Sequence, residues 1–98
     1  MGAVAGVGST YNYMPEVYKG IFDSMSRNDI ETARRLQMKS IKVVEVIIRY
    51  GGGVRGGKAI MNAIGIGCGD CRLPITPFGE KEFERLKADL HEIGFPKL

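Results

Sequence analysis

The chain has 98 residues, enough for one small domain. Its 44% hydrophobic and 26% charged residues are typical of a globular protein and exclude a wholly disordered one. Fourteen basic and eleven acidic residues give a formal net charge of +3 without a block of like charges, so charge alone does not indicate nucleic-acid binding.

Residues 2–10 are predicted to form a β-strand. They are small and apolar with no alternation of polar positions, a pattern typical of a strand buried on both faces of a parallel sheet. Gly2, Gly6 and Gly8 contribute no side-chain packing, and a single strand cannot satisfy its own backbone donors and acceptors. The chain therefore either pairs with another copy or is a piece of a larger sheet protein.

Helices are predicted after this strand. Pro15 suits the first position of a helix over residues 15–25. Asn28 and Glu31 resemble a capping box at the start of a long second helix, where Asp29 favours the positive helix end. We expect the buried stripe of this second helix to consist of Ile30, Ala33, Leu36, Ile41, Val44, Ile47 and Ile48.

The remaining pattern predicts two more helices. Glycines 51–53 end the second helix, and a short third helix is predicted over residues 57–64. The segment 65–77 is too broken by Gly and Pro for regular structure. A last helix is predicted over residues 80–93, with an acidic first turn. Its apolar stripe contains Phe83, Leu86, Leu90 and Ile93.

One motif suggests phosphate binding. The run from Gly52 to Lys58 has the G-x-x-x-x-G-K spacing of a loop whose backbone amides cradle phosphates. Ala59 stands where a Ser or Thr would hold magnesium, and the preceding segment is predicted to be a helix rather than a strand. We interpret the run as a glycine-rich junction between helices, with a small nucleotide-binding protein as the alternative.

Two other groups carry reactive side chains. Cys68 and Cys71 have the C-x-x-C spacing of a redox pair or half a zinc site, but a structural zinc needs four ligands and the pair lies in a predicted loop. His91, near the end of the last helix, has no partner at a spacing suited to acid–base catalysis. We interpret them as incidental thiols and a surface histidine, and no metal site is predicted.

The cellular setting follows from what the sequence lacks. Two cysteines cannot make a disulfide scaffold, which favours a reducing, cytoplasmic location. No apolar stretch reaches the roughly 18 residues needed to span a bilayer, and the first residues lack the basic flank of a signal peptide. We expect no membrane partner and no nucleic-acid partner.

Ser9 is the main candidate for a ligand contact. It lies at the carboxyl end of the predicted strand, and in barrels of alternating strands and helices that end builds the active site. The preceding glycines, Gly8 among them, let a ligand approach the backbone. A Gly-Ser-Thr run at a strand end is equally compatible with a turn or a helix cap, so the spacing alone leaves both open.

The run Gly6-Val-Gly8-Ser-Thr-Tyr-Asn12, followed by Lys58-Ala-Ile and Arg72-Leu-Pro-Ile, resembles the carboxyl-terminal part of the N-acetylneuraminate lyases. These enzymes belong to the pyruvate-dependent class I aldolases that include dihydrodipicolinate synthase. The resemblance implies an α/β fold, namely a carboxyl-terminal fragment of a TIM (β/α)8 barrel with one strand and about four helices. Residues 1–27 would be the last barrel strand and helix, and residues 28–98 the family's carboxyl-terminal helical extension.

The resemblance also implies an activity for the complete enzyme. Such enzymes cleave sialic acid to N-acetylmannosamine and pyruvate through a lysine Schiff base, with no metal or other cofactor, and are typically homo-tetramers. The Schiff-base lysine and the catalytic tyrosine lie earlier in the barrel, so the chain is expected to contain no catalytic residue and to be inactive alone. None of its seven lysines lies on the predicted strand: Lys19, Lys39, Lys42, Lys58, Lys81, Lys87 and Lys97.

Two residues carry over as substrate-binding positions. Ser9 matches a serine whose hydroxyl contacts the sugar-derived part of the substrate, and Gly8 beside it allows close approach. Tyr11 and Tyr13 do not match the catalytic tyrosine. The alternative interpretation is an autonomous helical oligomerisation or interaction module without catalysis, whose apolar strand pairs across copies.

Overall fold

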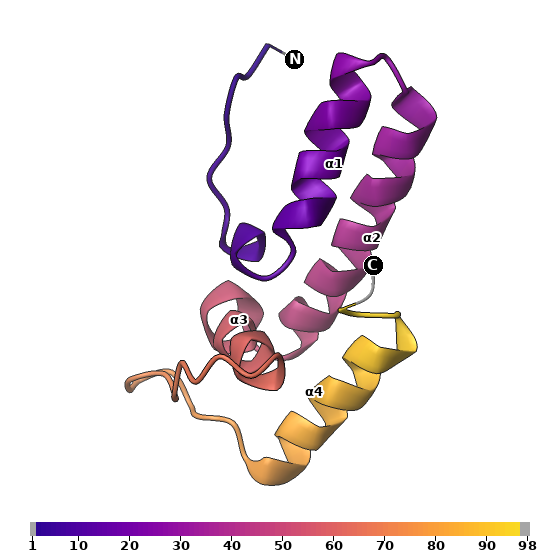
Figure 1. Ribbon diagram of the computed structural model, residues 1–98. Helices are drawn as coiled ribbons and strands as arrows, with labels where there is room; N and C mark the ends of the chain where they lie inside the picture. Colours follow the sequence, from indigo (N-terminus) through magenta and orange to yellow (C-terminus); the bar gives the residue numbers. More distant parts are fainter. Residues whose placement is uncertain (1, 97–98) are drawn as a thin grey trace.

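The computed structural model describes residues 2–96 as helices joined by loops (Figure 1). The elements in chain order are a 3-10 helix η1 (Ser9–Asn12) and the α-helices α1 (Pro15–Ser26), α2 (Ile30–Arg49), α3 (Gly52–Ala63) and α4 (Glu80–Glu92). Residue 1 and residues 97–98, which include Lys97, lie outside the described part; they are the first residue of the predicted region 1–27 and the last two of the predicted region 28–98. No helix in the described part is long and apolar enough to cross a membrane.

The helices α1 and α2 form an antiparallel hairpin (Figure 1). As predicted, Pro15 occupies the first turn of α1. The predicted capping box is wrong: Asn28 lies in the turn with φ +59°, and the cap of α2 is Asp29, whose carboxylate accepts a hydrogen bond from Thr32 N at 3.1 Å. That bond lowers the pKa of Asp29, because it stabilises the charged carboxylate at the positive end of the helix.

The core lies where the carboxyl-terminal half of α2 meets α3 and α4. Ile60 and Leu86 are fully buried there, together with Val43 of α2. The stripe predicted for α2 is partly wrong, since Ile48 is 66% exposed while Val43 and Val46 are buried. Helices α1, α3 and α4 all contact α2, so its buried positions extend beyond a single predicted stripe.

Helix α3 begins five residues earlier than predicted. Gly51 adopts φ +95° between α2 and α3, a left-handed conformation that glycine takes without a steric penalty. The glycines after it have low helix propensity, which is why the sequence pattern predicts a helix start only at residue 57. Tertiary packing overrides that propensity, because a Cβ at Gly56 would lie 3.0 Å from the side chain of Ile47 and only glycine allows α2 and α3 to approach so closely.

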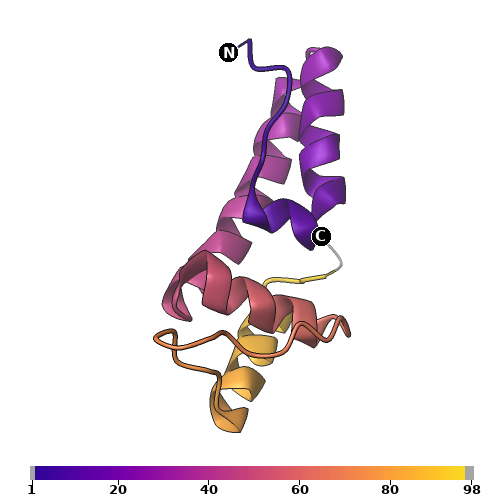
Figure 2. The same cartoon turned by 90° about the vertical axis from the view of Figure 1, so that its left-hand side faces the viewer.

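The predicted strand at residues 2–10 is not formed. Residues 2–8, the amino-terminal segment, have no regular structure, and Ser9 opens η1 instead of ending a strand. The segment runs past α1 in both views of the chain (Figures 1 and 2), and Val4 and Val7 are 98% and 104% exposed. The physical reason is that no strand lies beside it within residues 2–96, so its backbone has no sheet ladder to join.

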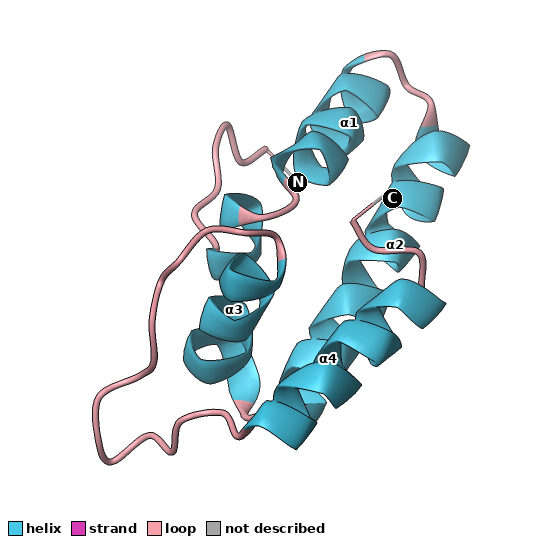
Figure 3. Ribbon diagram, turned by 60° about the horizontal axis from the view of Figure 1, so that its bottom comes forward, coloured by secondary structure: helices cyan, strands magenta, loops and turns pink. Residues whose placement is uncertain are grey.

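Residues 13–64 and 80–95, which contain the four α-helices, are called the helical body below. Its last two helices are joined by a long loop, residues 65–79, that arches away from α3 before returning to α4 (Figure 3). The predicted irregular segment 65–77 is thereby confirmed, and α4 lies within one residue of its predicted range.

Candidate functional site

Ser9 lies at the rim of an open groove between η1 and α3. The groove has a volume of about 460 Å³. Ser9 is itself exposed, and a Cβ added at Gly53 would lie 3.3 Å from its Oγ, so the first turn of α3 passes directly beside the hydroxyl. The lining residues are Ser9, Asn12, Tyr13, Gly53, Val54, Gly57, Lys58, Met61 and Cys68.

A chain of hydroxyl groups fixes η1 to the hairpin. The hydroxyls of Thr10 and Tyr18 lie 2.6 Å apart, and the Tyr18 hydroxyl lies 2.6 Å from that of Ser40. Ser40 is buried on α2, so a polar contact reaches from the core of the hairpin to the residue next to Ser9. Asn12 closes the short helix by donating its amide to the Ser9 carbonyl at 3.0 Å. The hydrogen bonds of Thr10 and Asn12 therefore hold Ser9 in place.

Gly8 is positioned by an aromatic ring. Its backbone is extended, and a Cβ at this position would lie 3.2 Å from the ring of Tyr11. The Tyr11 ring in turn lies 4.2 Å from that of Tyr18, centroid to centroid. Gly8 therefore makes room for Tyr11 in this structure, and its predicted contact with a substrate stays a prediction, as does that of Ser9.

Tyr13 forms part of the groove wall and was not singled out from the sequence as a site residue. It is 8% exposed, and its hydroxyl is buried without a hydrogen-bond partner among the described residues. Burial raises the pKa of Tyr13 to about 12, since a tyrosinate would be poorly solvated there. The hydroxyl lies next to α3, 3.9 Å from where a Cβ at Gly57 would be. Nothing in local sequence predicts an unpaired buried hydroxyl, because the residues that bury Tyr13 come from distant segments.

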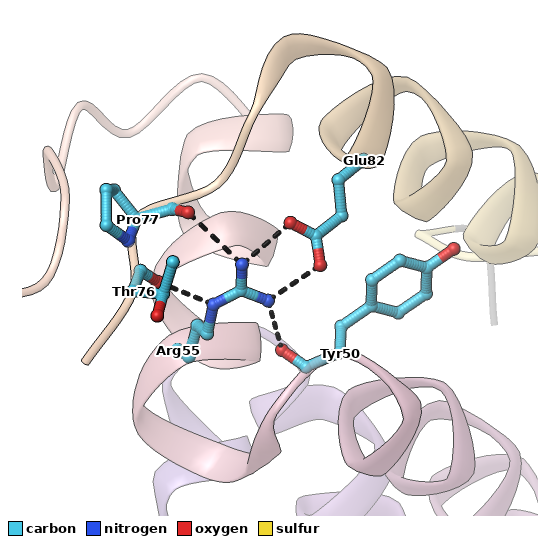
Figure 4. Close-up of polar contacts among 5 residues, drawn as sticks. All are labelled: Tyr50, Arg55, Thr76, Pro77 and Glu82. Atoms are coloured by element: carbon cyan, nitrogen blue, oxygen red, sulfur yellow. Dashed lines mark hydrogen bonds and ion pairs between the residues drawn. The ribbon is translucent and has the colours of Figure 1, made fainter.

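Arg55 fixes the end of the 65–79 loop that leads into α4. Its guanidinium donates to Glu82 Oε1 and Oε2 at 2.8 and 2.7 Å, and to the carbonyls of Thr76 and Pro77 at 2.6 and 3.2 Å (Figure 4). A further bond of 3.0 Å reaches the carbonyl of Tyr50. The bidentate contact with Arg55 lowers the pKa of Glu82, because it stabilises the carboxylate. Arg55 therefore ties α3, α4 and the end of the 65–79 loop together.

Lys58 holds the start of the same loop. Its Nζ donates to the carbonyls of Cys68 and Asp70 at 3.4 and 3.0 Å. Asn62, one turn later, accepts from Cys68 N at 2.8 Å and donates to the Gly69 carbonyl at 3.2 Å. The loop segment beside the groove is thus bound to α3 through its backbone.

The motifs from the sequence have the following places. The run from Gly52 to Lys58 forms the first two turns of α3, which confirms a glycine-rich helix junction rather than a strand-loop-helix phosphate loop. Cys68 and Cys71 are free thiols, and His91 is exposed in the last turn of α4. Within residues 2–96, no three His, Cys, Asp or Glu side chains lie close enough together to hold a metal ion.

Comparisons with known proteins place the chain in a family. The model of the dihydrodipicolinate synthetase family matches residues 1–93. The chain belongs to this family. It is 39% identical over 88 residues to N-acetylneuraminate lyases of Escherichia coli, including those of strains O1:K1 and K12, a match that covers 89% of this chain and 29% of each relative.

Solved structures of the same enzymes are similar in fold. A Proteus mirabilis N-acetylneuraminate lyase superposes with a TM-score of 0.87 at 31% identity, over 96% of this chain and 32% of that one. The N-acetylneuraminate lyase of Aliivibrio salmonicida, also described as a sialic acid aldolase, gives 0.86 at 28% identity over 96% and 31%. This member of the dihydrodipicolinate synthetase family therefore spans about a third of the relatives it matches, and the resemblance expected from the sequence is confirmed.

Proposed function

We propose that this chain acts as the carboxyl-terminal part of an N-acetylneuraminate lyase. In that role residues 1–27 supply the last strand and helix of a TIM barrel, and residues 28–98 supply the helical extension. The observation that supports the proposal is the match along nearly the whole chain to lyases that are about three times longer. The unpaired amino-terminal segment is consistent with it, because a strand between two other strands forms only when those strands are present.

Ser9 is the residue through which the chain would meet the substrate. Its hydroxyl lies at the rim of the groove beside α3, and Gly8 precedes it without a side chain. In the assembled enzyme these two positions contact the sugar-derived part of N-acetylneuraminate. The Schiff-base lysine and the proton-transfer tyrosine belong to the preceding two thirds of the enzyme, so this chain alone does not cleave sialic acid. The assembled enzyme is a cytoplasmic homo-oligomer, with sialic acid and pyruvate as its ligands.

A chimeric enzyme tests this proposal. The region of the Proteus mirabilis lyase that superposes on this chain is replaced by residues 2–96, and pyruvate release from N-acetylneuraminate is measured. We expect turnover by the chimera, none by the 98-residue chain, and covalent trapping of pyruvate by borohydride only in the chimera. The substitution Ser9→Ala is expected to raise KM for N-acetylneuraminate about tenfold or less, the range of one uncharged hydrogen bond.

The control for this variant is Ser26→Ala. Ser26 ends α1 and donates a hydrogen bond only to the nearby Asp23 carbonyl, so its loss should leave KM unchanged. Turnover by the isolated chain, with borohydride trapping on one of its own lysines, would overturn the inactivity of the chain. A folded but inactive chimera, together with a discrete and cooperatively melting oligomer of the 98-residue chain, would instead support a helical interaction module.

A further inference from the structure

We propose that the groove between η1 and α3 is a binding site for a phosphate-type oxyanion, held by the first-turn amides of α3, the Lys58 ammonium and the hydroxyls of Ser9 and Tyr13. The proposal concerns a site on this chain and does not depend on lyase activity. It rests on three independent features of the groove, which are the free end of a helix, a one-sided charge and an unpaired buried hydroxyl.

The first feature is the amino end of α3. A helix of twelve residues carries backbone N–H groups in its first turn that have no partner inside the helix, and its dipole makes this end positive. Gly51 gives no side-chain cap, and the first turn contains no acidic residue. Gly53 and Val54 of that turn line the groove. Because Gly53 has no side chain, an oxygen atom can approach these amides closely.

The second feature is the charge of the lining. Lys58 is the basic residue of the groove, and none of the other lining residues is an aspartate or glutamate. Its ammonium contacts two loop carbonyls and lies within no ion pair of the described residues. Backbone carbonyls satisfy its hydrogens without neutralising its charge, so the groove has a net positive potential that favours an anion.

The third feature points to a ligand directly. The Tyr13 hydroxyl is buried at the wall formed by Gly57 without a hydrogen-bond partner among residues 2–96, and leaving a buried polar group unpaired is destabilising. An acceptor oxygen entering the groove between Ser9 and Gly57 would give this O–H a partner. Three donor types would then converge on one ion, which suits a tetrahedral oxyanion with several acceptor oxygens better than a neutral sugar hydroxyl.

Phosphate titration of the 98-residue chain tests the site. Amide chemical shifts and the melting temperature are followed as inorganic phosphate is added, with sodium chloride at matched ionic strength as the reference. We expect saturable shifts at Gly53 and Val54 and a rise in Tm that chloride does not produce. Glucose 6-phosphate and glucose form two further arms. Tighter binding of the sugar phosphate than of phosphate identifies a phosphorylated sugar as the ligand, and phosphate binding alone identifies the free ion.

Two variants separate binding from folding. Lys58→Gln should weaken phosphate binding about tenfold, as expected for the loss of a charge-assisted contact. Tyr13→Phe should weaken it about two- to tenfold, yet leave the phosphate-free chain no less stable, because the removed hydroxyl has no partner in the described part of the chain. Lys81→Gln, an exposed lysine on α4, is the matched control.

The outcomes that overturn the site are specific. A response to phosphate no larger than that to chloride would exclude it, as would equal binding by the wild-type chain, Lys58→Gln and Tyr13→Phe. If the isolated chain gives no dispersed spectrum, the same phosphate-dependent Tm measurements are made on the chimeric lyase, where a missing difference between wild type and Lys58→Gln is equally decisive. Neither readout requires turnover, so failure of this site and failure of the lyase role are distinguished.

Discussion

The helical body and the amino-terminal segment differ in whether the chain completes their contacts. In the body, Ile60 and Leu86 are fully buried between helices that the same 98 residues provide. In the segment, Val4 and Val7 remain at 98% and 104% exposure although their residue type favours burial. Helices satisfy their backbone hydrogen bonds locally, whereas a strand depends on neighbours that lie elsewhere in sequence. The helices of the body therefore form from the chain's own residues, whereas the amino-terminal segment has no strand to pair with among residues 2–96.

The core of the helical body gives the largest expected effect. Ile60→Ala removes a side chain with 0% exposure, and we expect a loss of about 2–5 kcal/mol in the free energy of unfolding, from lost burial and the cavity left behind. Urea unfolding followed by circular dichroism measures it. Ile48→Ala, at a position that is 66% exposed, should cost about 1 kcal/mol or less. Equal effects at both positions would show that the body lacks a fixed core.

Arg55 should rank second, because it joins the body to the 65–79 loop. Arg55→Met breaks the bidentate contact with Glu82 and three bonds to carbonyls, and we expect a loss of about 1.5–3 kcal/mol. The control is Arg49→Met, whose side chain is 60% exposed and 3.7 Å from the Asp89 carboxylate. Exposed pairs contribute about 0–1 kcal/mol, so a comparable loss for Arg49 in thermal unfolding would contradict the role given to Arg55.

The same ion pair predicts a pH dependence. Arg55 lowers the pKa of Glu82 below its ordinary value of 4.5, so its contribution is fully present above that pH and is lost as the pH falls through the lower folded-state value. Melting temperature should decline on acidification below about pH 4.5, and Glu82→Gln should flatten part of that decline. Glu84→Gln, with a side chain 62% exposed, serves as the control. If melting temperature falls equally steeply with pH in Glu82→Gln and in the wild-type chain, the Arg55–Glu82 pair is not the source of the pH dependence.

The contrast also shows what a sequence can predict. Local signals place α1, α2 and α4 correctly, since Pro15 and the apolar spacing act within a few residues. They fail at the start of α3, where Gly56 is helical because it packs against Ile47 of the preceding helix α2. They fail at residues 2–10 because no strand lies beside this segment among residues 2–96. Ser9, singled out from its motif, lies at the rim of the groove and its substrate contact stays a prediction, while Tyr13 lines the groove only through tertiary packing.

Substitutions in the amino-terminal segment have the smallest expected effect on the stability of the isolated chain, and they give the sharpest test of whether the segment forms a strand in a complete enzyme. Val4→Asp and Val7→Asp should each change the free energy of unfolding of the 98-residue chain by less than about 0.5 kcal/mol, because both side chains are exposed. In the chimeric lyase, where we propose a strand buried on both faces, either carboxylate would be buried without a partner and should abolish folding or turnover.

The spacing of these two valines makes the test more specific. Residues 4 and 7 differ by an odd number, so their side chains point to opposite faces of a strand. A barrel strand is sensitive at both positions, whereas a strand added to the edge of another copy, with one face in solvent, tolerates one of them. Loss of chimera activity with Val4→Asp and Val7→Asp alike, and full stability of the isolated variants, would assign the segment to a closed sheet. Tolerance at a single position would assign it to pairing between copies.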